Sequence, residues 1–372
     1  MEIREISFFN SFQCAGGACS ETCCRGWLIP LEEEDQARLK KERGLFWLKY
    51  RLATWCGLKD NFNSTSRYCP FFNKDGLCSM QLQKGHDFIP EVCRSYPRYY
   101  RNNGCFEERM IDLSCIEGAK LWFENCFDFS FRIYDGAPES GRYGSNDEED
   151  FLHALESVRK EMADSLLQVK TANELNHLLS RIDAYGEAAQ KAYLNEEKDF
   201  LGRQPFATYQ EKEAGDFACF PYDGRILAKI LRTHLYSERL SVANPTLYRL
   251  CRSYIETERA TKDMAGLLKQ LFESFLKRYE RYVPYYGALY AYYLYQNFLN
   301  IYDDYSFRRN LRLGMIHLNV KFLFDVLMEH DTGTFGDAEF VRSLTVYNRR
   351  AYFNETIKDE MYRALEEMTA PA

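Results

Sequence analysis

Cysteines are the residues of this chain whose type and spacing most clearly indicate chemistry. The sequence has thirteen of them, and ten fall within the first 115 residues, eight of these with ligand-like spacing. These eight are Cys14, Cys19, Cys23, Cys24, Cys69, Cys78, Cys93 and Cys115. A thiolate is costly to bury alone, whereas a soft metal centre binds several thiolates at once. The clustering therefore predicts that the first part of the chain is organised around a metal.

Two separate loops supply the candidate ligands. In the first, FQCAGGACSETCCRGW, the small residues at 15–18 let the backbone wrap closely enough to aim several sulfurs at one centre. The second comprises YCPFFNKDGLC, with turn residues at 74–76, followed by IPEVCRSYPR. We predict that the two loops share one site, whose candidate metal ligands are Cys14, Cys19, Cys23, Cys24, Cys69, Cys78 and Cys93. Because adjacent side chains point in different directions, only one of Cys23 and Cys24 is expected to face the primary centre.

An all-sulfur ligand set is compatible with zinc or with an iron–sulfur cluster, and the spacing alone leaves both open. Paired C-x2-C hooks, which are common in zinc sites, are absent here. The long, uneven intervals favour a cluster, whose iron atoms are spread over a larger volume. The remaining cysteines are interpreted as small buried apolar residues, namely Cys56, Cys105, Cys126, Cys219 and Cys251.

Two arginines lie beside the second cysteine loop. Arg94 and Arg98 flank a Tyr-Pro pair next to Cys93. Their guanidinium groups have two possible roles, to bind a carboxylate or to balance the negative charge of a thiolate-ligated centre. The histidines occur singly, and the sequence contains no HExxH or G-x-S-x-G motif, so hydrolase functions have no support.

Composition restricts the class of protein further. The first residues, MEIREISFFN, carry charges where a secretory signal needs an apolar run, and no later run is long enough to span a bilayer. A soluble, cytoplasmic protein is therefore expected, in which reductants keep thiols unpaired. The net charge is -7. Residues 1–126 hold 17 basic and 17 acidic residues, so all of the net negative charge lies in residues 127–372. This distribution argues against nucleic-acid binding and suits a partner that presents lysines, although it is equally explained by solubility.

The elements that must position these cysteines follow from periodicity. One helix is expected at about 32–55, where acidic residues precede basic ones, as the helix dipole favours. The run DGAPESGRYGSNDEE at 135–149 is rich in Gly, Ser, Pro and acidic residues, which predicts a surface linker. Beyond the linker, Thr171 to Glu174 forms a capping box ahead of an amphipathic segment, and 264–279 repeats at three and four residues. Further helices are expected at about 151–167, 224–240, 245–260, 285–301, 306–329 and 355–368. We therefore predict a mainly α protein, with an irregular cysteine-rich metal-binding domain (1–134) packed on an all-helical substrate or partner domain (150–372).

Four linked motifs resemble those of a known family. They are C-x4-C-x3-CC-x2-W at 14–27, CPFFNKDGLC at 69–78, VCRSYPR at 92–98, and an SC pair at 114–115 that is followed by a helix. In this order they resemble the flagellin lysine N-methylases, a family related to proteins with a zinc- or iron-chelating CxxCxxCC domain. The Tyr-rich segment at 285–300 is similar to a helix of that family. The resemblance implies methyl transfer from S-adenosylmethionine to lysines of flagellin, with a [4Fe-4S] cluster held by the N-terminal cysteines.

The sequence shows neither of the usual sites for this methyl donor. It lacks a Gly-rich loop between a strand and a helix, and it lacks the C-x3-C-x2-C triplet of radical enzymes. One hypothesis is that an open iron of the cluster coordinates the donor's amino and carboxyl groups. Methyl transfer also needs a neutral lysine, which apolar aromatic walls favour by desolvation. Candidate cofactor-binding residues are therefore Arg94, Arg98, Tyr286, Tyr290 and Tyr293, although a tyrosine stripe of this kind is more often part of a helix core than of a cofactor site.

Two other classes of function stay open at this point. The first is a noncatalytic zinc- or iron-binding module that recognises a partner protein through its helices. The second is an iron–sulfur electron carrier or redox sensor, which would leave the large helical part without a task.

Overall fold

A four-stranded mixed sheet joins the start of the chain to segments about a hundred residues later. Its order is β4-β5-β1-β6, formed by Arg98–Asn102, Phe106–Ile111, Glu2–Ile6 and Phe131–Asp135. Strand β1 runs parallel to β5, with Glu2 opposite Phe106, and antiparallel to β6. The prediction that this part of the chain is irregular was wrong here. Strand β5 contains the buried charges Glu107 and Glu108, so its sequence does not alternate between apolar and polar residues.

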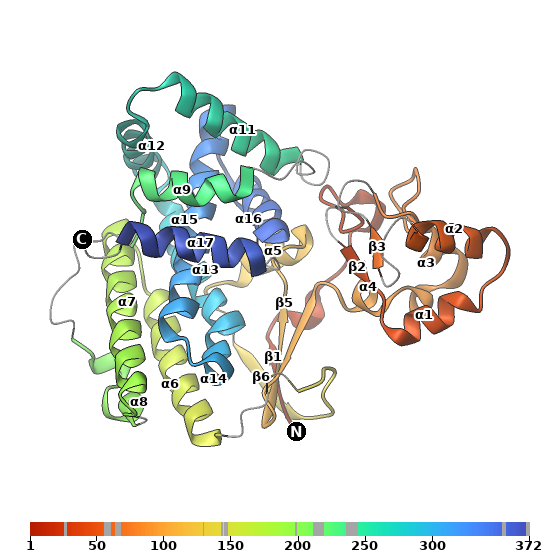
Figure 1. The fold of residues 1–372 in the computed structure, drawn as a ribbon, viewed down its shortest axis with the longest axis horizontal. Helices are drawn as coiled ribbons and strands as arrows, with labels where there is room; N and C mark the ends of the chain where they lie inside the picture. Colours follow the sequence, from red (N-terminus) through yellow and green to blue (C-terminus); the bar gives the residue numbers. More distant parts are fainter. Residues whose placement is uncertain are drawn as a thin grey trace.

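The computed structural model describes most of the chain. Left out are residues 26–27, 56–60, 64–67, 129, 143, 145–147, 198, 211–218, 236–244, 352–354 and 370–372. The described residues are mainly helical, which confirms the predicted class. Figure 1 shows a large helical body, with a smaller lobe set to one side that carries most of the cysteine segments.

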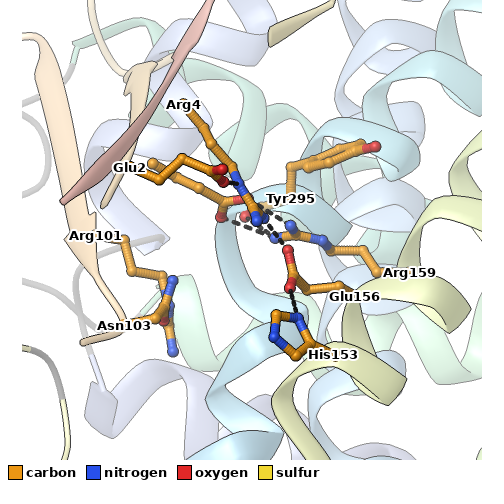
Figure 2. Close-up of polar contacts among 9 residues, drawn as sticks. Glu2, Arg4, Arg101, Asn103, His153, Glu156, Arg159 and Tyr295 are labelled. Carbon is orange, nitrogen blue, oxygen red and sulfur yellow. Dashed lines mark hydrogen bonds and ion pairs between the residues drawn. The ribbon is translucent and has the colours of Figure 1, made fainter. Parts of the chain in front are cut away.

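One buried and one partly buried ion pair fasten the sheet to helix α6 (Glu149–Leu166). The guanidinium of Arg159 donates to both carboxylate oxygens of Glu108 on β5 and lies 4.5 Å from the centroid of the Tyr295 ring. Figure 2 shows Arg4 of β1 lying between Glu2 and Glu156, and its Nε atom is 2.6 Å from Glu2 Oε1. These charges are satisfied by one another, so the polar strands can be buried against a helix.

The helical body follows the predicted periodicity closely. The capping box is present, since Thr171 accepts from the Glu174 amide and the Glu174 side chain accepts from the Thr171 amide. The other helices of the body are α5 (Ile116–Asn125), α7 (Ala172–Leu194), α8 (Phe200–Arg203), α9 (Gly224–Leu235), α11 (Pro245–Ala260), α12 (Met264–Arg278), α13 (Val283–Asn297), α14 (Ile301–Asp304), α15 (Phe307–Thr332), α16 (Asp337–Ala351) and α17 (Glu355–Thr369). Residues 236–240 of the predicted 224–240 helix lie outside the described residues. Within the described ranges, no helix has the length and apolar character that crossing a bilayer requires.

Helix α16 was not predicted from the sequence. It contains the run Thr345-Val346-Tyr347, whose β-branched and aromatic side chains favour strands. Tertiary packing overrides that preference, because all three side chains are buried in the body. Helix α15 ends at Thr332, and its C-cap Gly333 has a φ angle of 69°.

The smaller lobe is built from short elements: β2 (Leu28–Pro30), α1 (Glu33–Lys40), α2 (Gly44–Trp55), β3 (Asn61–Asn63), α3 (Ser79–Lys84) and α4 (Glu91–Ser95). The single helix predicted at 32–55 is two helices, and the second starts at Gly44, where φ is 70°. The lobe has a core of its own, which includes Leu39, Tyr50, Phe62 and Phe71.

The sheet shares its core with the helical body. Ile6 and Met110 from the sheet belong to the same buried cluster as Trp122 of α5 and Leu155 of α6. The described structure thus has two cores, one in the lobe and one formed by the sheet and the helices together. The division into domains at 1–134 and 150–372 stays a prediction.

Candidate metal centre

The structure brings the eight cysteines with ligand-like spacing around one cavity. The cavity has a volume of about 350 Å³ and is lined by Cys14, Cys19, Cys23, Cys24, Cys69, Cys78, Cys93 and Cys115, with Arg94 and Arg98 also in its wall. The twelve cysteines among the described residues are not joined in disulfides. Sulfur atoms from segments up to a hundred residues apart in the sequence therefore face one space.

Glycines allow the two cysteine loops to approach each other. A Cβ atom at Gly17 would lie 2.9 Å from the carbonyl oxygen of Asp75, closer than such contacts allow. Gly76 has a φ angle of 75°, and a Cβ atom there would lie 3.1 Å from the carbonyl oxygen of Gly17. The two turns pack backbone against backbone, so larger residues at these positions would separate Cys14 and Cys19 from the second loop.

Hydrogen bonds hold the start of the second loop and shape the turn within it. The amide of Cys69 donates to the carbonyl of Cys24 at 2.7 Å, which ties the two loops directly together. The side-chain oxygen of Asn73 accepts from the amides of Asp75 and Leu77, each at 2.9 Å, and so shapes the turn between Cys69 and Cys78. This turn chemistry was predicted at 74–76, and the structure adds Asn73 as the residue that organises it.

The last two cysteines of the set are carried by helices. Cys93 lies within α4, and Cys115 precedes the first residue of α5. Since α5 packs in the core of the helical body, Cys115 is the member of the set that this body positions. The cavity therefore has walls from both parts of the molecule.

Burial raises the pKa of several thiols at the cavity, including those of Cys69, Cys93 and Cys115. Desolvation, the largest cause, raises the pKa of Cys69 and that of Cys115 to about 12. Cys93 is exposed when the whole residue is considered, but it lines the cavity. Desolvation, followed by the negative charge of the Cys23 thiolate, raises the pKa of its thiol well above the ordinary value. Each thiolate that forms makes ionisation of its neighbours harder. A cation bound among them would offset this repulsion and keep the sulfurs deprotonated, as metals do with their thiol ligands.

Arg349 of α16 reaches the first cysteine loop from the interior of the helical body. Its guanidinium donates to the carbonyl oxygens of Glu21 at 2.7 Å, Thr22 at 3.1 Å and Ser114 at 3.0 Å. Its positive charge lowers the pKa values of Cys19 and Cys23, against the larger effect of burial on Cys19 and of the Cys24 hydrogen bond on Cys23. Sequence reasoning missed this residue, because α16 was not predicted and lies more than 300 positions from the loop.

The residues present fit a thiolate-ligated centre in donor type, in burial and in available volume. The cavity also has apolar walls, including Phe12, Ile29, Phe62 and Phe71, which exclude water as metal–sulfur sites require. Within the described part of the chain, no three Cys, His, Asp or Glu side chains meet closely enough to bind a single ion as they stand. The identity of the centre stays a prediction.

The three predicted tyrosines lie elsewhere, in the core of the helical body. Tyr286, Tyr290 and Tyr293 are at most 2% exposed, and their hydroxyls donate to Asp325, to the Leu311 carbonyl and to Asn348, respectively. None of them lines the cysteine cavity. Tyr290 and Tyr293 line a second cavity of about 190 Å³, which shares no wall residue with the first. The structure therefore groups Arg94 and Arg98 with the cysteines and separates the tyrosines from them.

The remaining cysteines largely match their predicted role. Cys126, Cys219 and Cys251 are buried in the core of the helical body, away from the cavity. Cys105 is partly buried and packs against the same core, and Cys56 lies outside the described residues. The buried three confirm the interpretation as small apolar residues.

Comparisons with known proteins return relatives of one kind. The chain is 27% identical over 125 residues to the flagellar biosynthetic protein FliU of Salmonella muenchen, a match that covers 31% of this chain and 73% of FliU. It is 26% identical to a lysine N-methylase of Salmonella typhimurium and 28% identical to one of Salmonella choleraesuis, each over 125 residues. Each of these two matches covers 31% of this chain and 31% of the enzyme. No family model and no solved structure matches the chain. The relatives confirm the resemblance to flagellin lysine N-methylases.

Proposed function

We propose that this protein is a lysine N-methyltransferase that transfers a methyl group from S-adenosylmethionine to lysine side chains of flagellin, with an iron–sulfur cluster bound by its N-terminal cysteines. The observation that carries the proposal is the convergence of eight cysteines on one cavity, in a chain similar to proteins named lysine N-methylase. The described cysteines form no disulfides, which suits a reducing compartment, so we place the reaction in the cytoplasm.

The cysteines would hold the cluster from both parts of the molecule. Cys69 and Cys78 belong to the lobe, Cys115 precedes a helix of the body, and the loop with Cys19 and Cys23 lies between them. When bound, a [4Fe-4S] cluster with one open iron supplies a position for the amino and carboxyl groups of the methyl donor. Zinc stays the alternative metal, and the uneven spacing of the cysteines supports the cluster.

The wall residues suit a reaction that needs a neutral amine. The lysine must lose a proton before its nitrogen can attack the methyl carbon, while the bond from that carbon to sulfur breaks and its electrons go to sulfur. Apolar side chains such as Phe12 and Ile29 lower the pKa of a bound lysine by desolvation. Arg94 and Arg98 lie in the same wall, where a guanidinium would bind a carboxylate or offset thiolate charge.

Metal analysis of two matched variants tests the centre. Cys69→Ala removes a sulfur at the cavity, whereas Cys126→Ala removes a buried sulfur away from it. Protein purified without oxygen should contain iron and sulfide in the wild type and in Cys126→Ala, and neither in Cys69→Ala. Zinc in the wild type, with no iron or sulfide, would contradict the cluster and favour the noncatalytic interaction module.

A transfer assay tests the reaction itself. The wild type and Cys126→Ala should transfer label from methyl-labelled S-adenosylmethionine to flagellin, and mass spectrometry should locate the methyl groups on lysines. Cys69→Ala should give no transfer while keeping its helical circular dichroism signal. Iron-loaded wild type that methylates no lysine of flagellin would refute the proposed activity.

A further inference from the structure

Helix α2 of the lobe has apolar side chains on opposite faces. One face carries Phe46 and Tyr50, which pack in the core of the lobe, where the Phe46 ring centroid lies 5.3 Å from that of Phe71. The opposite face carries Leu45, Leu48 and Leu52. A helix that is apolar all round is normally buried on all sides, so this exposed face requires an explanation.

The three leucines are strongly exposed. Leu45, Leu48 and Leu52 have 84%, 48% and 50% of their surface accessible to solvent. Helix α2 contacts α1 and β3 within the lobe, and Figure 1 shows it on the side of the lobe away from the helical body. Single exposed leucines are ordinary, but a contiguous stripe on one helix is typical of an interaction surface.

The spacing of the stripe is that of a coiled-coil seam. Leu45, Leu48 and Leu52 follow one another at three and four residues, which corresponds to positions a, d and a of a heptad. Lys49 and Arg51 then occupy the e and g positions on either side of the seam, and both side chains are exposed. Helix α2 contains no acidic residue. The flanks of the stripe are therefore uniformly basic.

We propose that α2 is a docking site for an acidic amphipathic helix of a partner protein, with leucine-like residues facing the stripe and Glu or Asp facing Lys49 and Arg51. Residues at e and g select partners by charge, and basic flanks select acidic ones. A helix that lies on a membrane needs a wide apolar face, whereas Lys49 and Arg51 border the leucine stripe on both sides and Arg51 lies over the ring of Trp47, the other exposed apolar side chain described on this helix. The inference goes beyond the proposed methyl transfer and does not depend on it.

Two peptides of about three heptads test the partner chemistry. Both carry Leu at a and d, and they differ only in having Glu or Lys at e and g. The Glu peptide should bind the full-length protein saturably by fluorescence anisotropy, and the Lys peptide should bind at least about tenfold more weakly. Equal binding of the two peptides, or no binding of either, would overturn the proposal.

Two exposed substitutions locate the site without disturbing the core. Leu48→Gln should weaken the Glu peptide about tenfold, because an apolar contact at the centre of the seam is lost. The double variant Lys49→Glu/Arg51→Glu should reverse the preference, so that the Lys peptide binds better. Far-UV circular dichroism should be unchanged in both variants. Binding of anionic vesicles that Leu48→Gln abolishes, with no peptide binding, would assign the stripe to a membrane instead and refute the protein partner.

Discussion

Replacing Arg349 by glutamine should loosen the cysteine loop from the helical body. The side chain is 8% exposed, and its guanidinium donates to three backbone carbonyls, two in the loop and one beside Cys115. Each buried carbonyl left without a hydrogen-bond donor lowers the free energy of unfolding by about 1–3 kcal/mol. Glutamine would still donate to one of the three carbonyls. The variant also avoids the desolvation cost of a buried positive charge, which offsets part of the loss. We therefore expect the free energy of unfolding to fall by about 2–4 kcal/mol.

The neighbouring Arg342 provides a matched control on the same helix. Its Nε atom lies 3.1 Å from Glu21 Oε1, so it contacts the same loop, but its side chain is 49% exposed. The pair is exposed on the Arg342 side and buried on the Glu21 side, and glutamine can still donate a hydrogen bond to the Glu21 carboxylate. Arg342→Gln should therefore lower the free energy of unfolding by about 1 kcal/mol, less than Arg349→Gln does. Arg349→Lys should fall between the two, since lysine keeps the charge and loses the planar fork.

Urea unfolding followed by circular dichroism measures the difference in stability, and iron analysis measures the consequence for the centre. Arg349→Gln should unfold at lower urea concentration and bind less iron than Arg342→Gln, prepared in parallel. If the two variants unfold alike and bind as much iron as the wild type, Arg349 does not hold the loop. Lower stability with full iron binding would show that it supports the fold alone.

Three further predictions concern the helical body. The buried pair Lys321 and Asp325 is fully inaccessible, so Asp325→Asn should cost about 3–5 kcal/mol in urea unfolding, whereas adding Lys321→Met should restore much of the loss. Burial lowers the pKa of Lys321 to about 8, below its ordinary value of 10.5. The unfolded chain therefore binds more protons between these values, so stability should rise with pH across that window in the wild type and stay flat, by comparison, in Lys321→Met. Finally, Thr171→Ala should cost about 1 kcal/mol through the loss of the capping box, and the exposed change Lys170→Ala provides its control.

Much of the body could be predicted from sequence because its signals are local. The box at Thr171 and Glu174 lies within one turn, and the apolar repeats that define α6 and α12 extend over several turns of one helix. Such patterns need no knowledge of distant segments. The sheet could not be found in this way, since Glu107 and Glu108 in β5 are buried only because partners elsewhere in the chain satisfy them.

The candidate site likewise contains residues that local sequence could identify and residues that only the fold could place. Ligand-like spacing and glycines identified the cysteine loops, because a chelating loop has to be short and flexible. Placing the tyrosines of α13 at the site required knowing what their helix face packs against, which local spacing does not show. A stripe on a helix shows which residues share a face, but only the fold shows that this face packs in the body's core.

The position of the cavity gives the proposed centre a structural consequence. Cys69 belongs to the core of the lobe, whereas Cys115 precedes a helix that packs in the core of the body. A group bound by cysteines from both sides binds only the docked arrangement of lobe and body, and mass action then stabilises that arrangement by the binding energy. Arg349 of the body binds the loop with Cys19 and Cys23, which lies between these two parts, through uncharged carbonyls and without needing the metal. The protein would thus hold its cysteine loop near the final position beforehand, so that metal binding completes the docking and does not have to create it.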